Sequence, residues 1–131
     1  MKYISLNHNS APTSFKKAVI NGLAPDKGLY FPEKDVKLPK SFIESLKTLD
    51  NNEICYEVIS NYIDDEIPKN KLLEIVNDTI SFKIPLKKIE QSVYSLELFH
   101  GPTLAFKDIG AKFMASCLNY FKDSYTSKKI T

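Results

Sequence analysis

One stretch of this chain decides its fold: SLELFHGPTLAFKDIG, residues 95–110. Its first part is apolar and predicts a β-strand that ends near Phe99. The pair Gly101-Pro102 then breaks the strand, because glycine permits positive φ, whereas proline fixes φ and lacks an N–H donor. Beyond this loop, apolar residues recur at steps of three and four and predict a helix over roughly 106–122. The apolar face of that helix consists of Phe106, Ile109, Phe113, Met114, Cys117, Leu118 and Phe121.

A lysine, Lys107, falls at the start of the predicted helix. The partial positive charge of a helix N-terminus disfavours a cation there. Burial among Leu104, Phe106 and Ile109, which we expect around the amine, would also favour its neutral form. A neutral amine is a nucleophile that can form a Schiff base. Spacing alone favours the opposite interpretation, a solvated lysine whose stem covers apolar surface, because lysine is among the most exposed residues.

Composition places the chain among ordinary globular proteins. It has 131 residues, 43% hydrophobic and 26% charged, with seven Tyr and eight Phe that can fill a core. A net charge of +2 with scattered lysines gives no basis for binding nucleic acid or a membrane surface. We see no signal peptide and no run near the roughly 20 apolar residues that a membrane span needs.

The two cysteines, Cys55 and Cys117, are far apart in the sequence and fall on predicted buried helix faces. We expect both to be reduced core residues, as in a cytoplasmic protein. No cluster of Cys and His has metal-ligand spacing, so we expect no metal site.

Capping residues mark two helices before the decisive stretch. Thr13 or Ser14 can cap the start of one helix, which Gly22 would end. Asp50 and Glu53 have the spacing of a capping box, in which each side chain accepts a hydrogen bond from the other residue's backbone N–H. The first 80 residues are therefore predicted to be mostly helical.

The rest of this region is expected to be turns and shorter elements. Residues 3–6 suggest a short strand, and 24–32 form a turn whose Leu29, Tyr30 and Phe31 would enter the core. Helical spacing continues over 41–49 and 68–79, with an acidic, solvated turn at 64–66 between them. Residues 80–86 are predicted to be an extended link, and 87–91 lead into the strand that ends near Phe99.

The chain therefore divides into two parts in our prediction. Residues 1–90 would form a helical domain, and 91–131 would begin a larger α/β domain, so that the fold class of the chain is α+β. A polar turn at 123–127 and the start of another strand at 129–131 would make a βαβ unit cut short. Parallel sheets need several strands with both faces covered, so we expect a truncated portion of a longer enzyme.

Two runs of sequence resemble the threonine synthase family. Residues 96–108, LELFHGPTLAFKD, resemble the lysine motif that binds pyridoxal phosphate in that family. Residues 21–32, NGLAPDKGLYFP, are similar to an N-terminal segment of its bacterial and fungal type, and 65–68 fit its spacing. The resemblance covers essentially the whole chain, but only the front portion of the longer family chain.

This resemblance implies a function. The full enzyme would be a carbon–oxygen lyase that converts O-phospho-L-homoserine and water into L-threonine and phosphate. Its cofactor would be pyridoxal 5′-phosphate, held by Lys107 as a Schiff base, and residues 91–131 would begin the fold type II domain known from the tryptophan synthase β chain. By position in the motif, His100, Gly101 and Thr103 would touch substrate or cofactor, whereas Asp108 would be a dipole partner of the helix.

The resemblance also implies what this chain lacks. The family has a glycine-rich loop for the cofactor phosphate, and no such loop occurs among these residues. We therefore expect the chain alone to retain the cofactor poorly, to be inactive, and to have the remainder of the parent chain as its structural partner.

Other interpretations stay open. The loop with His100, Gly101 and Thr103 could be a turn that only positions Lys107. The chain could be a non-catalytic helical module for packing or partner binding, in which Lys107 is inert. It could also come from another pyridoxal-phosphate-dependent lyase, although the element His-Gly-Pro-Thr before Lys107 argues against that.

Overall fold

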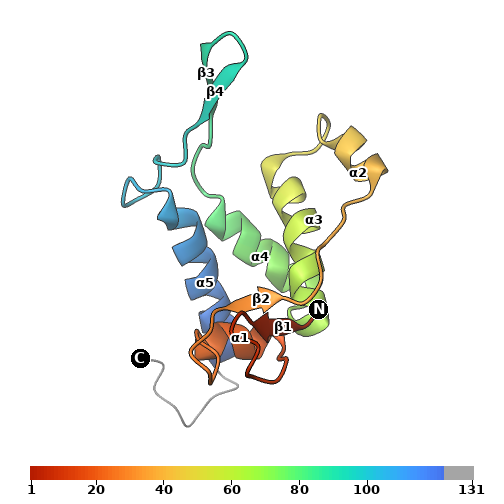
Figure 1. The fold of residues 1–131 in the computed structure, drawn as a ribbon. Helices are drawn as coiled ribbons and strands as arrows, with labels where there is room; N and C mark the ends of the chain where they lie inside the picture. Colours follow the sequence, from red (N-terminus) through yellow and green to blue (C-terminus); the bar gives the residue numbers. More distant parts are fainter. Residues whose placement is uncertain (123–131) are drawn as a thin grey trace.

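The computed structural model of the protein describes residues 1–122 (Figure 1). Within these residues, five α-helices and a single 3₁₀ turn are combined with two separate two-stranded sheets, so the α+β class is confirmed. The turn and strand predicted at 123–127 and 129–131 lie outside the described residues. The elements are β1 (Tyr3–Ser5), α1 (Phe15–Asn21), β2 (Tyr30–Pro32), α2 (Lys40–Ser45), α3 (Asn51–Ile63), the 3₁₀ turn η1 (Asp64–Glu66), α4 (Lys69–Thr79), β3 (Leu86–Glu90), β4 (Val93–Leu96) and α5 (Lys107–Phe121).

The predicted caps are present at both helices. Ser14 Oγ accepts a hydrogen bond from Lys17 N at 3.4 Å, and α1 ends at Gly22, whose φ is 68°. At α3, Glu53 N donates to Asp50 Oδ1 and Asp50 N donates to Glu53 Oε2, each at 2.8 Å. Both capping predictions are therefore confirmed. Helix α2, in contrast, ends at residue 45, short of the predicted 49.

One hydrophobic core joins α1, α3, α4 and α5 with strand β1. The ring of Phe15 lies between those of Tyr3 and Phe121, with centroids 5.9 Å and 6.3 Å away. The core residues are Tyr3, Phe15, Ala18, Ile63, Ile67, Leu72, Ile75, Val76, Cys117 and Phe121. Helix α5 thus shares the core of the preceding helices, while the domain division at residue 90 stays a prediction.

The acidic turn η1 holds helix α1 in place. Glu66 accepts hydrogen bonds from Phe15 N at 2.8 Å and from Lys16 N at 3.1 Å, through its two carboxylate oxygens. Asp64 forms an ion pair with the amino terminus of Met1. The prediction of a merely solvated turn is therefore wrong for Glu66, because its carboxylate satisfies free N–H groups at the start of α1.

A second carboxylate, the half-buried Asp26, organises the turn at residues 24–32. Asp26 accepts hydrogen bonds from Ser5 Oγ at 2.7 Å, Asn9 N at 2.9 Å and Gly28 N at 3.0 Å. The Ser5 hydroxyl, followed by these backbone N–H groups, lowers the pKa of Asp26 against the opposing effect of burial. The hydroxyl leaves no room for a side chain at Gly28, where a Cβ would overlap Ser5 Oγ.

The aromatic and aliphatic residues of that turn do not all enter the core. Tyr30 packs against it, but Leu29 is 61% exposed and Phe31 is 55% exposed. Strand β2 pairs antiparallel with β1 through Ser5↔Tyr30 and Ile4↔Phe31. Because neighbouring residues of a strand point to opposite faces, only one of Tyr30 and Phe31 can face the helices, so the prediction is wrong for Phe31.

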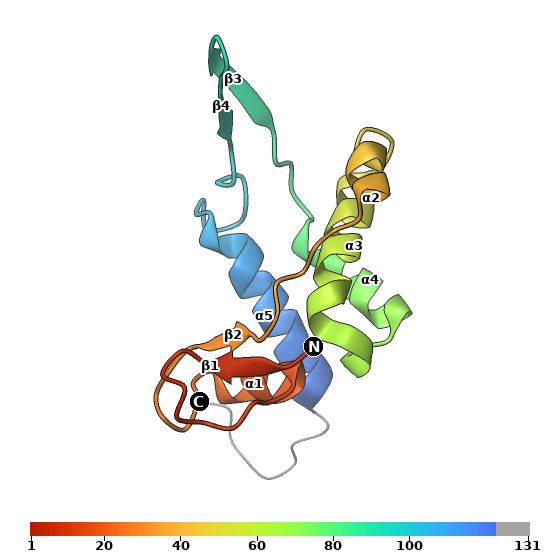
Figure 2. The same cartoon turned by 45° about the vertical axis from the view of Figure 1, so that its right-hand side comes forward.

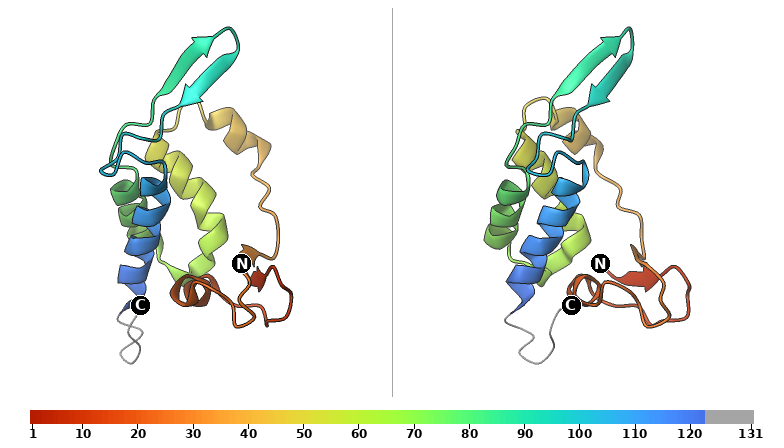
Figure 3. Two further views of the ribbon diagram at one scale, coloured as in Figure 1. Left: turned by 60° about the vertical axis from the view of Figure 1, so that its left-hand side comes forward. Right: turned by 90° about the vertical axis from the view of Figure 1, so that its left-hand side faces the viewer.

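The segment before α5 is a hairpin that projects from the helices (Figures 2 and 3). Strands β3 and β4 pair antiparallel, with Leu86 opposite Leu96 and Lys88 opposite Tyr94. Strand β3 thus begins at the end of the predicted link and takes up most of the predicted lead at 87–91, and the strand predicted to reach Phe99 ends at Leu96. In residues 1–122 strand β4 pairs only with β3, and helix α5 follows it. The second strand of the expected βαβ unit was predicted at 129–131, outside the described residues, so that unit stays a prediction.

Three further expectations concern the cysteines, a metal site and a membrane span. Cys55 and Cys117 are free thiols, as predicted, and burial raises the pKa of the fully buried Cys117 to about 12. Within the described part of the chain, no three His, Cys, Asp or Glu residues gather as a metal site would require. No helix described there has both the length and the apolar character to span a membrane.

Candidate functional site

Lys107 is the first residue of α5, as the sequence predicts. Its side chain is exposed, and so are two of the neighbours that we expected to enclose it, Leu104 at 75% and Phe106 at 65%. Ile109 is half-buried. The expectation of an apolar enclosure is therefore wrong for this chain, because the described residues place nothing over these side chains. What the fold does provide is an accessible primary amine at a helix N-terminus.

The residue after the lysine, Asp108, is buried and ties the preceding loop to the helix. Its carboxylate accepts hydrogen bonds from Thr103 N, at 2.9 Å, and from Thr103 Oγ1. The Thr103 hydroxyl, followed by backbone N–H groups, lowers the pKa of Asp108 against the opposing effect of burial. Asp108 therefore does more than complement the helix dipole, the role that the sequence suggested.

The loop around Asp108 has little room and an unusual backbone. Gly101 is buried, and a Cβ at this position would overlap Asp108 Oδ2 and lie 2.9 Å from Asp108 Cβ. Leu104 N donates to Gly101 O at 3.1 Å, and Leu104 has φ of 57°, in the left-handed region that side chains with a Cβ rarely adopt. Glycine is therefore required at residue 101 by the close approach of the carboxylate.

His100 belongs to the same loop but has partners of its own. Its Nε2 lies 2.8 Å from Glu97 Oε2, and its ring packs against Phe99 with centroids 4.8 Å apart. The structure thus brings His100, Gly101 and Thr103 into one loop directly before Lys107. The hydroxyl of Thr103 donates to Asp108, an arrangement that the sequence analysis missed.

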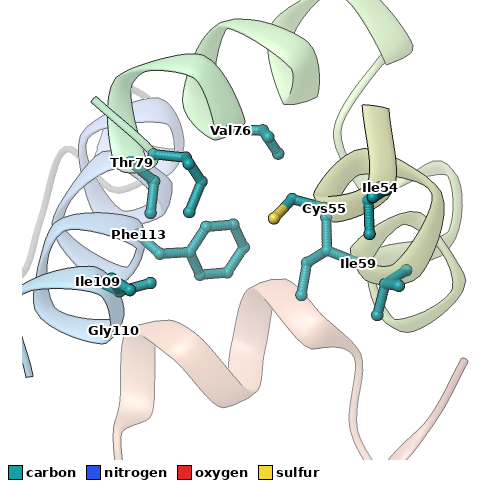
Figure 4. A pocket seen from close by; sticks show the side chains of 10 residues that line it. Ile54, Cys55, Ile59, Val76, Thr79, Ile109, Gly110 and Phe113 are labelled. Atoms are coloured by element: carbon teal, nitrogen blue, oxygen red, sulfur yellow. The ribbon is translucent and has the colours of Figure 1, made fainter. Parts of the chain in front are cut away.

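An apolar groove lies beside the N-terminal half of α5 and was not predicted (Figure 4). It has a volume of about 350 Å³ between α3, α4 and α5, with the ring of Phe113 near its centre. Burial raises the pKa of Cys55, a thiol in its wall, so this group stays protonated and offers no base. The lining residues are Ile54, Cys55, Val58, Ile59, Val76, Thr79, Ile80, Ile109, Gly110 and Phe113. The groove suits packing, and its sequence signal was the apolar face predicted for α5, to which Ile109 and Phe113 belong.

The described residues fit part of a pyridoxal phosphate site. Lys107 offers the amine that would bind the cofactor aldehyde. A phosphate, however, needs free backbone N–H groups, which glycine-rich loops supply. Within residues 1–122, the Ser5 hydroxyl fills the space at Gly28, with the Asp26 carboxylate just behind it, and the Asp108 carboxylate fills the space at Gly101. Both carboxylates would repel an anion. The geometry of residues 1–122 therefore supports covalent attachment of the cofactor at Lys107 but supplies no binding site for its phosphate at these two glycines.

Comparisons with known proteins point to one family. A family model described as the threonine synthase N terminus matches residues 2–80. Threonine synthase of Haemophilus influenzae is 41% identical over 118 residues, covering 90% of this chain and 27% of its own length. Threonine synthase of Escherichia coli is 39% identical over 120 residues, which cover 92% of this chain and 28% of the length of that protein.

Solved structures give the same result. The crystal structure of threonine synthase from Escherichia coli superposes with a TM-score of 0.87 at 38% identity, over 93% of this chain and 28% of that one. The structure of PLP-bound threonine synthase from Brucella melitensis superposes with a TM-score of 0.91 at 30% identity, over 98% of this chain and 29% of that one. The chain thus spans less than a third of the length of these relatives.

Proposed function

This chain belongs to the threonine synthase family, and we propose that it supplies the cofactor-binding lysine of an enzyme that makes L-threonine and phosphate from O-phospho-L-homoserine and water. The observation that carries the proposal is the exposed amine of Lys107 at the first position of α5. It lies in a fold that superposes on a threonine synthase whose description names bound PLP.

In this proposal, Lys107 forms the covalent bond to pyridoxal 5′-phosphate and afterwards moves protons on the bound substrate. The cofactor, when bound, supplies an electron sink for carbanion chemistry. The amine is accessible from solvent, so it can meet the cofactor aldehyde. Leu104 and Phe106 present apolar side chains beside it, and covering these would exclude water from the reaction.

The loop before Lys107 forms one wall of the proposed site. His100 is exposed and its ring is held by Glu97, so the ring is accessible to a ligand in a fixed position. Gly101 and Thr103 line this wall, and both the N–H and the hydroxyl of Thr103 already donate to Asp108. The substrate contacts of these three residues remain part of the proposal.

Residues beyond this chain complete the proposed enzyme. The phosphate seat would come from the part of the family chain that the relatives have in addition, with residues 91–131 starting a fold type II domain. The remainder of a threonine synthase chain is therefore the structural partner. Free thiols at Cys55 and Cys117 fit a reducing compartment, and we place the protein in the cytoplasm.

A chimera tests the function. This chain replaces the matching N-terminal part of Escherichia coli threonine synthase, and phosphate release from O-phospho-L-homoserine is measured. We expect activity in the chimera and a loss of at least about 100-fold in Lys107→Ala, because a catalytic acid–base group contributes that much or more. Lys122→Ala, an exposed lysine directly after the same helix, is the matched control and should keep full activity.

The site assignment has its own readout. After incubation of the chimera with pyridoxal phosphate and borohydride, peptide mapping should find the modified amine at Lys107. Labelling spread evenly over the exposed lysines, together with full activity of Lys107→Ala, would refute the proposal and favour the non-catalytic alternative.

A further inference from the structure

The hydrogen bonds of Asp108 close a short segment of backbone that contains the lysine. Thr103 N and Thr103 Oγ1 donate to the two carboxylate oxygens, so the chain from Thr103 to Asp108 forms a ring, with Lys107 as one of its members. A second, smaller turn lies inside it, in which Asp108 N donates to Ala105 O at 3.1 Å. The backbone that carries Lys107 is therefore constrained on both sides.

One residue of this ring, Leu104, has an unfavourable backbone conformation. Leu104 has φ of 57°, although a side chain with a Cβ is disfavoured there. With 75% of its side chain exposed, Leu104 gains little from burial in return. Such conformations persist only where the surrounding structure enforces them. Besides the turn bond from Leu104 N to Gly101 O, the enforcing contacts here are those of Asp108.

Gly101 makes the approach of the carboxylate possible. A Cβ at residue 101 would overlap Asp108 Oδ2, so any other residue would push Asp108 away from the loop. At the helix start itself, Phe106 occupies the N-cap position and offers no side-chain hydrogen bond. Asp108 is therefore the side chain that joins this loop to α5, within the described residues.

From these contacts we propose that Asp108 is a positioning residue for Lys107: its bonds to Thr103 fix the turn that sets the direction in which Lys107 leaves helix α5. The inference rests on the proposed function of Lys107. It adds that Lys107 carries the reacting amine, whereas Asp108 fixes the backbone that carries Lys107. Thr103 and Gly101 serve the lysine through Asp108.

Backbone dynamics of the 131-residue chain test this inference. Amide nitrogen relaxation and hydrogen exchange are measured by NMR for residues 103–108 and for the later turns of α5. In the unchanged chain we expect order parameters near about 0.85 across this segment. In Asp108→Asn they should fall below about 0.6 at residues 103–107, and the Thr103 amide should exchange roughly tenfold to a hundredfold faster, the value of a hydrogen bond to a charged group.

Three further variants sharpen the test. Thr103→Val removes one of the two bonds and should give an intermediate loosening, whereas Thr103→Ser keeps the hydroxyl and should restore the order of the unchanged chain. Asp35→Asn changes an exposed carboxylate in a distant loop and should have no effect. If Asp108→Asn fails to fold, the comparison of Val with Ser at residue 103 still decides the question.

The inference is overturned if residues 103–107 keep their order parameters and exchange rates in Asp108→Asn, or if Thr103→Ser loosens the turn as much as Thr103→Val. It fails separately from the proposed function. Activity of the chimera with Lys107→Ala would refute the role of the lysine, whereas the relaxation data report on the turn whatever that lysine does.

Discussion

Replacing Phe121 with alanine removes the ring that attaches the last turn of α5 to helix α1. Phe121 is 3% exposed, and its ring meets that of Phe15 edge-on, with centroids 6.3 Å apart and planes at 62°. The Nζ atom of Lys16, in helix α1, lies 5.6 Å from the centroid of the Phe121 ring. The side chain is thus in contact with residues more than a hundred positions away in the sequence.

The expected loss follows from this burial. A buried Phe→Ala substitution costs about 3–5 kcal/mol through lost transfer energy and the remaining cavity. The edge-on aromatic pair accounts for about 0.5–1.5 kcal/mol of it. Because all the main helices share one core, the whole loss should be seen in a single unfolding transition.

The assay is urea unfolding followed by far-UV circular dichroism. We expect a lower midpoint with an unchanged m-value, because the surface exposed on unfolding stays the same. Met114→Ala on the same helix is the control, since Met114 is 46% exposed and should shift the free energy of unfolding by only about 0.5 kcal/mol. A loss below about 1 kcal/mol for Phe121→Ala, or a separate transition of α5 alone, would refute the single core and support a division near residue 90.

Three more predictions rest on individual contacts. Gly28→Ala should lower the free energy of unfolding by about 1–3 kcal/mol, because the new Cβ would overlap Ser5 Oγ. Gly110→Ala should raise it by about 0.4–1 kcal/mol, because a Cβ there has nothing within 4 Å and stiffens the unfolded chain. Thermal unfolding measures both changes. Burial raises the pKa of Tyr3 from 10 to about 12, so the native state keeps a proton that the unfolded state releases. The contribution of Tyr3 to the free energy of unfolding should therefore be constant below pH 10 and fall as the pH rises toward 12. Denaturation of a Tyr3→Phe variant at a series of pH values should lack this component. Asp50→Ala should destabilise the chain by about 1 kcal/mol through loss of the capping box, and urea unfolding would contradict this if the midpoint stayed constant.

Local sequence chemistry predicted the helices because their signals are local. The residues Asp50 and Glu53 lie one helical turn apart, and Ser14 and Gly22 mark the ends of a single helix. The start of α5 at Lys107 followed in the same way, from a glycine–proline break and a regular apolar spacing. These features depend on neighbours within a few residues, which the sequence displays directly.

The errors concern what lies across space from a residue. Apolar side chains such as Leu104 and Phe31 were expected to be buried, because a sequence shows the hydrophobic character of a residue but not whether anything covers it. Glu66 was assigned to solvent, because its partners at the start of α1 lie about fifty residues earlier in the chain. The bond between Thr103 and Asp108 is closer, at five residues, and it was missed because its geometry depends on the positive φ of Leu104.

The hairpin of β3 and β4 gives this chain an uneven distribution of local stability. All five residues of β3 are exposed, and two-stranded hairpins are marginal in water when nothing packs on them. The bond from Glu97 N to Pro85 O, at 3.0 Å, closes the base of this arm. Above that point, fraying of the two strands breaks no contact of the helical core, so the arm opens on its own at a free energy far below that of global unfolding. Within residues 1–122, the first site of cleavage by a protease should therefore be the tip of this arm, and the two resulting fragments should stay associated through the helical core.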